Sequence, residues 1–193
     1  MKRASDLRKS GLLGIFNSPA LAMFAVAVLS TLVYWRALGF AFFNDDPTGH
    51  FRWMENQSLL QIFGNVVGQG YYRPIVFAVL KSVWGISGGY NAVAFHALLV
   101  LLHAANTALL WWLAWYWGKA PYALLVALAF VTFPFSYEAV AYVAGLGHPL
   151  LAFWTLLTLL LYHRGRESNA KRYRVGAHLT LLLGLFTHEN GLV

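Results

Sequence analysis

The chain has 193 residues, of which 59% are hydrophobic and 11% are charged, and its formal net charge is +7. Soluble domains contain about 45–50% apolar and about 25% charged residues, so this composition excludes a soluble globular domain and indicates a membrane protein. The absence of cysteine excludes a disulfide framework, a thiol nucleophile and a Cys-based metal site. The basic residues flank hydrophobic segments, so membrane lipid is an expected partner and nucleic acid is not.

Five apolar segments predict transmembrane helices, most of them near the ~20 residues that cross a bilayer. In chain order they are residues 19–43, 90–117, 120–143, 148–162 and 175–193. The sequence therefore predicts an all-α integral membrane protein with a single membrane domain over residues 1–193. The last span runs to the C-terminus without a polar tail, so we expect the chain to be truncated there.

The connecting segments fix the expected topology. Residues 44–89 are predicted to form an outer loop with interfacial helices, because the apolar segment 74–88 within it is short and carries Lys81. With five spans, residues 1–18 and the basic loop 163–174 both face the cytoplasm, together with ten of the fourteen Lys and Arg residues. A sixth span would move the basic loop outside, against the positive-inside rule.

The predicted outer loop carries two groups suited to chemistry. Asp45 and Asp46 are adjacent carboxylates, and partial desolvation near a membrane should raise the pKa of at least one, as a general base requires. The alternative is a solvated turn, because the surrounding Asn-Asp-Asp-Pro residues are turn formers. Arg73 precedes Pro74 at a predicted helix start, where a guanidinium could bind a phosphate or only anchor the interface.

Three polar residues share one stripe of the second predicted span, namely His96, His103 and Asn106. Polar groups inside a bilayer face the protein interior and need partners, so helix–helix hydrogen bonding is the expected role. The more specific alternative is that these histidines ligate a haem, but a second helix would then have to supply the other axial ligand of the haem iron.

Four more titratable residues lie near the outer ends of later spans. Glu138 follows Pro134 near the end of the third span, and it should need a partner such as Arg73 or His148. His188 and Glu189 are adjacent in the outer half of the last span.

The order of these elements resembles polyprenyl-phosphate-sugar-dependent glycosyltransferases of the C-type membrane fold, in particular protein O-mannosyltransferases and those that carry TPR repeats. The resemblance covers only the N-terminal part of such enzymes. The matching elements are Asp45–Asp46, Arg73–Pro74, the set His96, His103 and Asn106, then Pro134, Glu138, Gly145 and Gly147, and finally His188–Glu189.

This resemblance implies a hexosyl- or pentosyltransferase in a bacterial cytoplasmic (inner) membrane, with its N-terminus in the cytoplasm. Asp45 or Asp46 would be the base that activates an outer-face protein, lipid or glycan acceptor. Arg73, helped by His188, would hold the phosphate of the polyprenyl-phosphate sugar donor. The supporting polar network would be Glu138, His148, Glu189, His96, His103 and Asn106.

No cofactor or metal is required by this scheme, although the acidic pair with His50 could bind a divalent cation. Two positions depart from the family pattern: Gly147–His148 replaces an Arg-acid pair, and His188 replaces a lysine, which makes a weaker phosphate clamp. A non-catalytic glycosyltransferase-like subunit that packs in a larger membrane-protein complex is therefore the main alternative. A transporter or haem-binding subunit is a third hypothesis, and it rests only on the intramembrane histidines.

Overall fold

The computed structural model describes residues 18–43, 45–46, 51–66 and 70–192 of the chain, and it contains only helices and connecting segments there. The elements, in chain order, are α2 (Pro19–Tyr34), η2 (Trp35–Gly39), α3 (Phe51–Glu55), α4 (Leu59–Gly64), α5 (Pro74–Ile86), α6 (Ala92–Val131), α7 (Ser136–Ala141), η4 (Val143–Leu146), α8 (Gly147–Ser168), α9 (Lys171–Leu185) and η5 (Glu189–Leu192). The predicted all-α class is confirmed.

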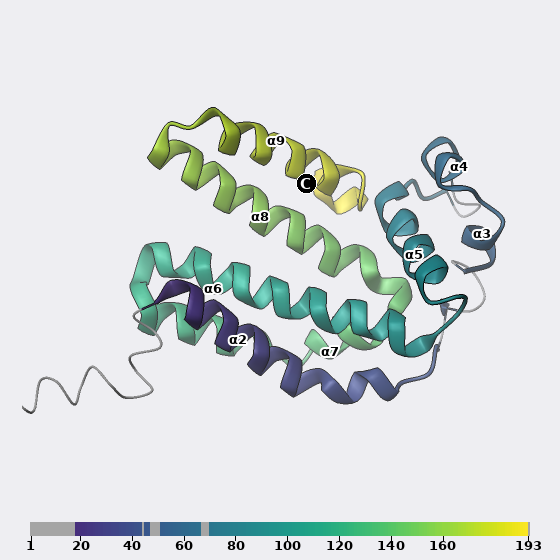
Figure 1. Ribbon diagram of the computed structural model, residues 1–193, viewed down its shortest axis with the longest axis horizontal. Coiled ribbons are helices and arrows are strands. Elements are labelled where there is room, and N and C mark those ends of the chain that lie inside the picture. Colours follow the sequence, from purple (N-terminus) through teal and green to yellow (C-terminus); the bar gives the residue numbers. More distant parts are fainter. Residues whose placement is uncertain (1–17, 44, 47–50, 67–69, 193) are drawn as a thin grey trace, which may run out of the picture.

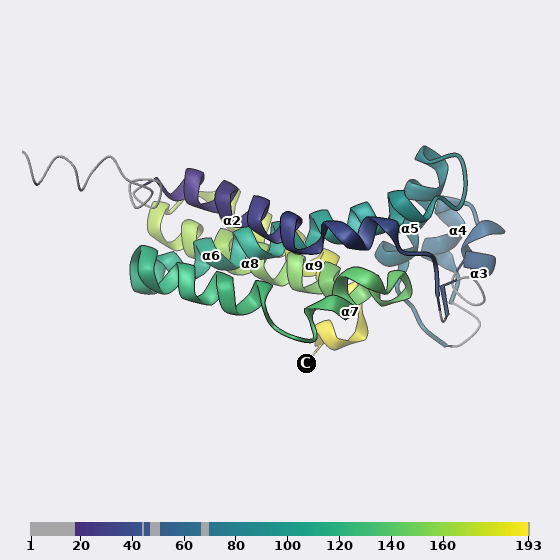
Figure 2. The same ribbon diagram turned by 90° about the horizontal axis from the view of Figure 1, so that it is seen from below.

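Three helical segments are long and apolar enough to cross a membrane: Pro19–Gly39, Ala92–Thr132 and Val143–Ser168. The second of them is interrupted at Lys119, whose φ of 58° and ψ of −168° are not helical. Pro121 follows two residues later, in the first turn of the second arm, where proline is favoured because its missing N–H would have no partner within the helix. The chain reverses at this break, so α6 consists of two arms, as Figure 2 shows. The break lies between the second and third predicted spans.

Both arms of α6 pack against the first helix. Ala22 and Val26 of α2 share one buried cluster with Trp111 of the first arm and with Ala123 and Ala127 of the second. Small residues let the helix backbones approach closely, which is how helices associate in membranes. The predicted spans at 19–43 and 90–143 therefore form one packed unit.

The structure corrects the boundaries of the later predicted segments. The helix of the predicted span 120–143 ends at Val131, and the separate short helix α7 follows. The predicted basic loop 163–174 is mostly helical, because α8 continues to Ser168 and α9 begins at Lys171. Hydropathy detects where apolar residues end, but a helix can continue through charged residues once it leaves the bilayer.

The tight turn between α8 and α9 is closed by Asn169, which adopts a left-handed conformation with φ of 50°. Asparagine tolerates this backbone better than most residues and commonly ends helices in this way. The helix of the predicted last span 175–193 is α9, which has 15 residues and ends at Leu185. It is not among the three helical segments long and apolar enough to cross a membrane.

The predicted outer loop 44–89 contains the three short helices α3, α4 and α5, and Figures 1 and 2 place them together at one end of the molecule. Phe77 and Leu80 of α5 are buried against Phe95 and Leu99 at the start of α6. Each such side chain contributes about 1.5–3 kcal/mol when fully buried. This cluster fixes the start of α5, and with it Arg73, beside the helix bundle.

Candidate functional site

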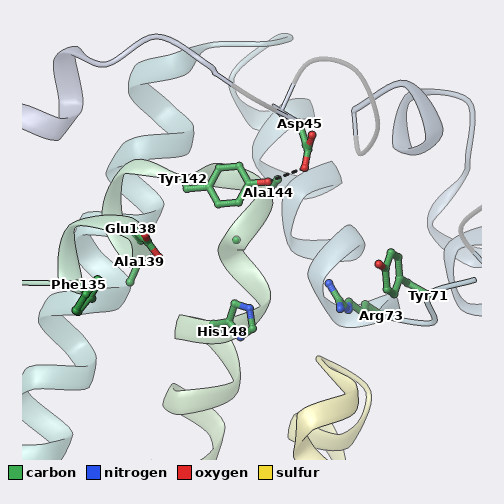
Figure 3. Close-up of a pocket in the computed structure, with 10 residues that line it drawn as sticks. Asp45, Tyr71, Arg73, Phe135, Glu138, Ala139, Tyr142, Ala144 and His148 are labelled. Atoms are coloured by element: carbon green, nitrogen blue, oxygen red, sulfur yellow. Dashed lines mark hydrogen bonds between the residues drawn. The ribbon is translucent and has the colours of Figure 1, made fainter. Parts of the chain in front are cut away.

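A cavity of about 460 Å³ lies at the end of the bundle where α5, α7 and the start of α8 meet. Figure 3 shows its lining residues, which are Asp45, Tyr71, Arg73, Phe135, Glu138, Ala139, Tyr142, Ala144, Gly145 and His148. Four of them, Asp45, Arg73, Glu138 and His148, are predicted site residues. They come from three regions of the chain, at residue 45, at residue 73 and at residues 138–148, so the fold assembles this cavity.

Asp45 presents its carboxylate to the cavity. The hydroxyl of Tyr142 donates a hydrogen bond of 3.0 Å to Asp45 Oδ2, as the dashed line in Figure 3 marks. Burial, together with this hydrogen bond and the charge of Asp45, raises the pKa of Tyr142 to about 12. Tyr142 therefore remains a protonated donor at neutral pH and orients the carboxylate.

Asp46 points the other way, into the protein, where it is fully buried. Its Oδ1 accepts a hydrogen bond of 2.6 Å from the backbone N–H of Ala144, and its Oδ2 accepts one of 3.3 Å from that of Phe43. Burial raises the pKa of Asp46, and these backbone hydrogen bonds oppose the rise in part. Asp46 thus ties the loop after η2 to η4, while Asp45 is the carboxylate of the pair that lines the cavity.

Arg73 forms an ion pair with Glu189 through two parallel hydrogen bonds. Arg73 Nε lies 2.8 Å from Glu189 Oε2, and Arg73 Nη2 donates to Glu189 Oε1. This pairing lowers the pKa of Glu189 to about 2. The guanidinium also lies 4.5 Å from the ring centroid of Tyr71, within the range of a cation–π contact. Its remaining N–H groups are the donors that an anion in the cavity could use.

His188 does not line the cavity. It is only 4% exposed, its ring lies 4.5 Å from that of His148, and its Nδ1 accepts the backbone N–H of Asn190 at 3.2 Å. Burial and the nearby Arg73 lower the pKa of His188. A neutral, buried imidazole is a poor phosphate ligand, so the predicted role of His188 in phosphate binding gains no support here.

Glu138 and His148 line the same cavity without pairing with each other. The hydrogen bond that the structure gives Glu138 comes from the hydroxyl of Tyr137, at 3.4 Å, and not from the expected Arg73 or His148. Glu138 is exposed on α7 and is not buried inside the protein. The expected pairing of its carboxylate with Arg73 or His148 is therefore not seen.

The polar stripe of α6 lies inside the bundle, away from this cavity. Asn106 Nδ2 donates a hydrogen bond of 2.8 Å to the carbonyl of Pro149 in α8, which is the helix–helix contact expected of it. His103 is stacked on Phe130 with ring centroids 4.8 Å apart, and His96 lies against Phe42 at 6.2 Å. Both histidines pack against aromatic rings, but His96 Nδ1 and Nε2 and His103 Nε2 are buried without a hydrogen-bond partner among the described residues. The expected helix–helix hydrogen bonding is therefore seen for Asn106 and not for the two histidines.

Tyr142 and Tyr71 of the cavity lining have no counterpart among the predicted site residues, and Gly145 was named only as part of the family resemblance. A tyrosine that orients a carboxylate leaves no periodic signal in a sequence. For Tyr71 a weak signal existed, because an aromatic residue two positions from an arginine can stack under the guanidinium.

Within the described residues, no group of three or more His, Asp or Glu side chains could hold a metal ion. His50, which was considered as a metal ligand with the acidic pair, lies outside the described residues. That no metal is required stays a prediction.

The cavity brings the carboxylate of Asp45 and the guanidinium of Arg73 together at one end of a helical membrane protein. Sequence comparison adds the family resemblance.

The chain is 35% identical over 133 residues to human "Protein O-mannosyl-transferase TMTC4" and 32% identical over 130 residues to the mouse protein of the same name. The matches cover 60% of this chain but only 17% and 18% of the relatives, so the chain spans less than a fifth of the length of the curated proteins that it matches. No family model and no solved structure matches it. The similarity supports an O-mannosyltransferase-like family and a glycosyltransferase-like membrane function. Because both relatives are mammalian, the expected bacterial inner membrane gains no support from them.

Proposed function

We propose that the chain is part of a membrane glycosyltransferase that moves a sugar from a polyprenyl-phosphate donor to an acceptor on the outer face of the membrane. The observation that carries the proposal is that Asp45 and Arg73 line one cavity of about 460 Å³. A proton acceptor and an anion ligand are the two groups that this transfer needs from the protein.

In the proposed reaction, Asp45 takes the proton of an acceptor hydroxyl or amide. The acceptor oxygen or nitrogen attacks the anomeric carbon with inversion, and the bond from that carbon to the phosphate oxygen breaks. The electron pair stays on the leaving polyprenyl phosphate, where Arg73 stabilises the developing charge. No cofactor or metal takes part in this scheme.

Tyr142 acts as a positioning residue for Asp45. Its hydroxyl contributes one hydrogen bond to the carboxylate, at 3.0 Å. A carboxylate has several lone pairs, so Asp45 keeps room to accept the acceptor's proton. The pKa of Tyr142, raised to about 12, keeps the proton of this hydrogen bond on the phenol.

The charge distribution supports an outward-facing cavity. The opposite end of the bundle carries Lys119 at the break in α6, Arg164 and Arg166 at the end of α8, and the basic start of α9. Under the positive-inside rule this end faces the cytoplasm, as does the N-terminus, and the cavity then opens on the other side.

The test is transfer of radiolabelled mannose from polyprenyl-phosphate mannose to membrane protein, in membranes that contain the full natural gene product. Mannose is the probe because the relatives are named O-mannosyl-transferases. Asp45→Asn should lower the rate by at least about 10²-fold, the usual contribution of a general base. Glu55→Gln is the matched control, since Glu55 is an exposed acid of the same outer segment that does not line the cavity.

Undiminished transfer by Asp45→Asn would refute the assigned base. If the unmodified protein transfers no sugar and is instead isolated in a stable complex with other membrane proteins, the alternative takes its place: a non-catalytic glycosyltransferase-like subunit. Arg73 is the residue that favours this alternative, because part of its hydrogen-bonding capacity is already taken by Glu189.

A further inference from the structure

A second, larger cavity of about 690 Å³ lies at the other end of the molecule, between α2 and the first arm of α6. Its lining is Ser18, Pro19, Ala20, Met23, Phe24, Ala27, Ala108, Trp112, Trp115 and Arg164. Apart from Ser18, Arg164 and the indole N–H groups of Trp112 and Trp115, the lining side chains are apolar. A hollow with this lining on the side of a membrane-spanning helix pair suits a hydrocarbon chain.

Arg164 supplies one charged group to this apolar cavity. Its guanidinium lies 5.0 Å from the ring centroid of Trp112 and 5.9 Å from that of Tyr116. Its Nε is buried and has no hydrogen-bond partner in the described part of the chain. Arg164 lines the cavity, and a guanidinium has further N–H groups with which it can bind an anionic oxygen.

The surroundings of Arg164 are strongly positive. Lys119 lies over the ring of Trp115, which lines the cavity, at 4.7 Å. Arg166 is two residues further along α8, on the other face of the helix, and adds to the positive charge of this end. The acid at this end among the described residues is Glu167, which lies 3.6 Å from His163 Nδ1. Basic groups near a membrane surface attract anionic lipids, so the charge of this end selects a negative headgroup.

We propose that this cavity binds an anionic phospholipid. One acyl chain lies against Met23, Phe24 and Trp112, and the phosphate accepts hydrogen bonds from Arg164. The site is separate from the cavity that contains Asp45, because the two lie at opposite ends of the long helices α2 and α8, which Figures 1 and 2 show side by side with α6. It therefore holds a structural lipid and does not depend on the proposed transferase reaction.

The test is native mass spectrometry of the purified full-length protein with dioleoyl phosphatidylglycerol or dioleoyl phosphatidylcholine. The two lipids share their acyl chains and differ in net charge. We expect phosphatidylglycerol to bind at least about fivefold more tightly, which is the weight of one basic group near an anionic lipid. Arg164→Gln should remove this preference. Arg166→Gln, the same change at an exposed arginine of the same helix that does not line the cavity, should keep it.

A second variant tests the apolar part of the site without altering its charge. Ala108→Phe places a bulky side chain in the cavity and should lower occupancy by both lipids, and it keeps the proposal testable if Arg164→Gln fails to fold. Equal binding of the two lipids by the unmodified protein would overturn the proposal. So would equal effects of Arg164→Gln and Arg166→Gln, or displacement of the lipid by millimolar glycerol 3-phosphate, which has the headgroup chemistry without the chains.

Discussion

Replacing Asp46 with alanine should destabilise the protein, because this side chain satisfies two backbone N–H groups. The hydrogen bond from Ala144, at 2.6 Å, is short, buried and charge-assisted, and its loss should cost about 1.5–3 kcal/mol. The bond from Phe43, at 3.3 Å, is weaker and should add about 0.5–1 kcal/mol. The cost of burying the carboxylate offsets part of the stability that these two hydrogen bonds provide, so Asp46→Ala should lower the unfolding free energy by about 2 kcal/mol.

The pH dependence of this loss has a definite sign. Because burial raises the pKa of Asp46 in the folded protein above its ordinary value of 3.8, the folded state binds the proton more tightly than the unfolded state. The penalty for the ionised carboxylate therefore shrinks as the pH falls, and the unmodified protein gains stability relative to Asp46→Ala. The difference in unfolding free energy should be larger at pH 4.5 than at pH 7.

The assay is unfolding of the purified protein in detergent micelles, followed by tryptophan fluorescence. Asp45→Ala is the matched control: Asp45 is exposed, and the hydrogen bond that it accepts is from the side chain of Tyr142, so its loss should cost under about 1 kcal/mol. Equal losses for the two variants, or a larger loss for Asp45→Ala, would refute the assignment of Asp46 as the buried tie between the loop and η4.

Two further predictions use the same unfolding assay. The pair of Arg73 and Glu189 should stabilise the protein by about 1 kcal/mol at most, because Glu189 is half exposed. Since the pKa of Glu189 is lowered to about 2 from 4.5, this stabilisation is complete above pH 4.5 and is lost as the pH falls toward 2. The difference in unfolding free energy between the unmodified protein and Glu189→Gln should therefore shrink over that range. A difference that stays constant would contradict the pairing. Gly147→Ala should destabilise by about 1–3 kcal/mol, because the added Cβ would lie 2.8 Å from Cδ2 of the buried His188. Gly85→Ala in α5, where the new Cβ meets open space, should stabilise by about 0.4–1 kcal/mol, and changes of the same sign at both glycines would show that the contact with His188 does not matter.

The fold class could be predicted because it depends on composition and on long-range averages. The apolar content excluded a soluble domain, Pro74 marked the start of α5, and the gap between the predicted spans 90–117 and 120–143 marked the break in α6. The separation of α7 from the second arm of α6 was not predicted, because the span was assigned from hydropathy alone, and Pro134 between the two helices was not used as a break signal. The continuation of α8 to Ser168 was also not predicted, because the charged residues after residue 162 were interpreted as the end of the helix.

The site could be predicted in part. The predicted topology placed four site residues at one end of the bundle, namely Asp45, Arg73, Glu138 and His148. In the structure all four line one cavity. The choice between Asp45 and Asp46 could not be made, because neighbouring carboxylates of one turn have the same chemistry and differ only in the direction they point.

The pairing of Arg73 with Glu189 could not be predicted either, because the two residues are 116 positions apart. It matters for the proposed reaction. A polyprenyl-phosphate sugar is a diester with one negative charge, whereas the released phosphate is a monoester that carries close to two at neutral pH. With Glu189 neutralising the guanidinium, long-range attraction for the donor is weak, and the free N–H groups of Arg73 act mainly through short hydrogen bonds. Such bonds strengthen as charge develops on the leaving oxygen, so the pairing favours the transition state over the bound donor.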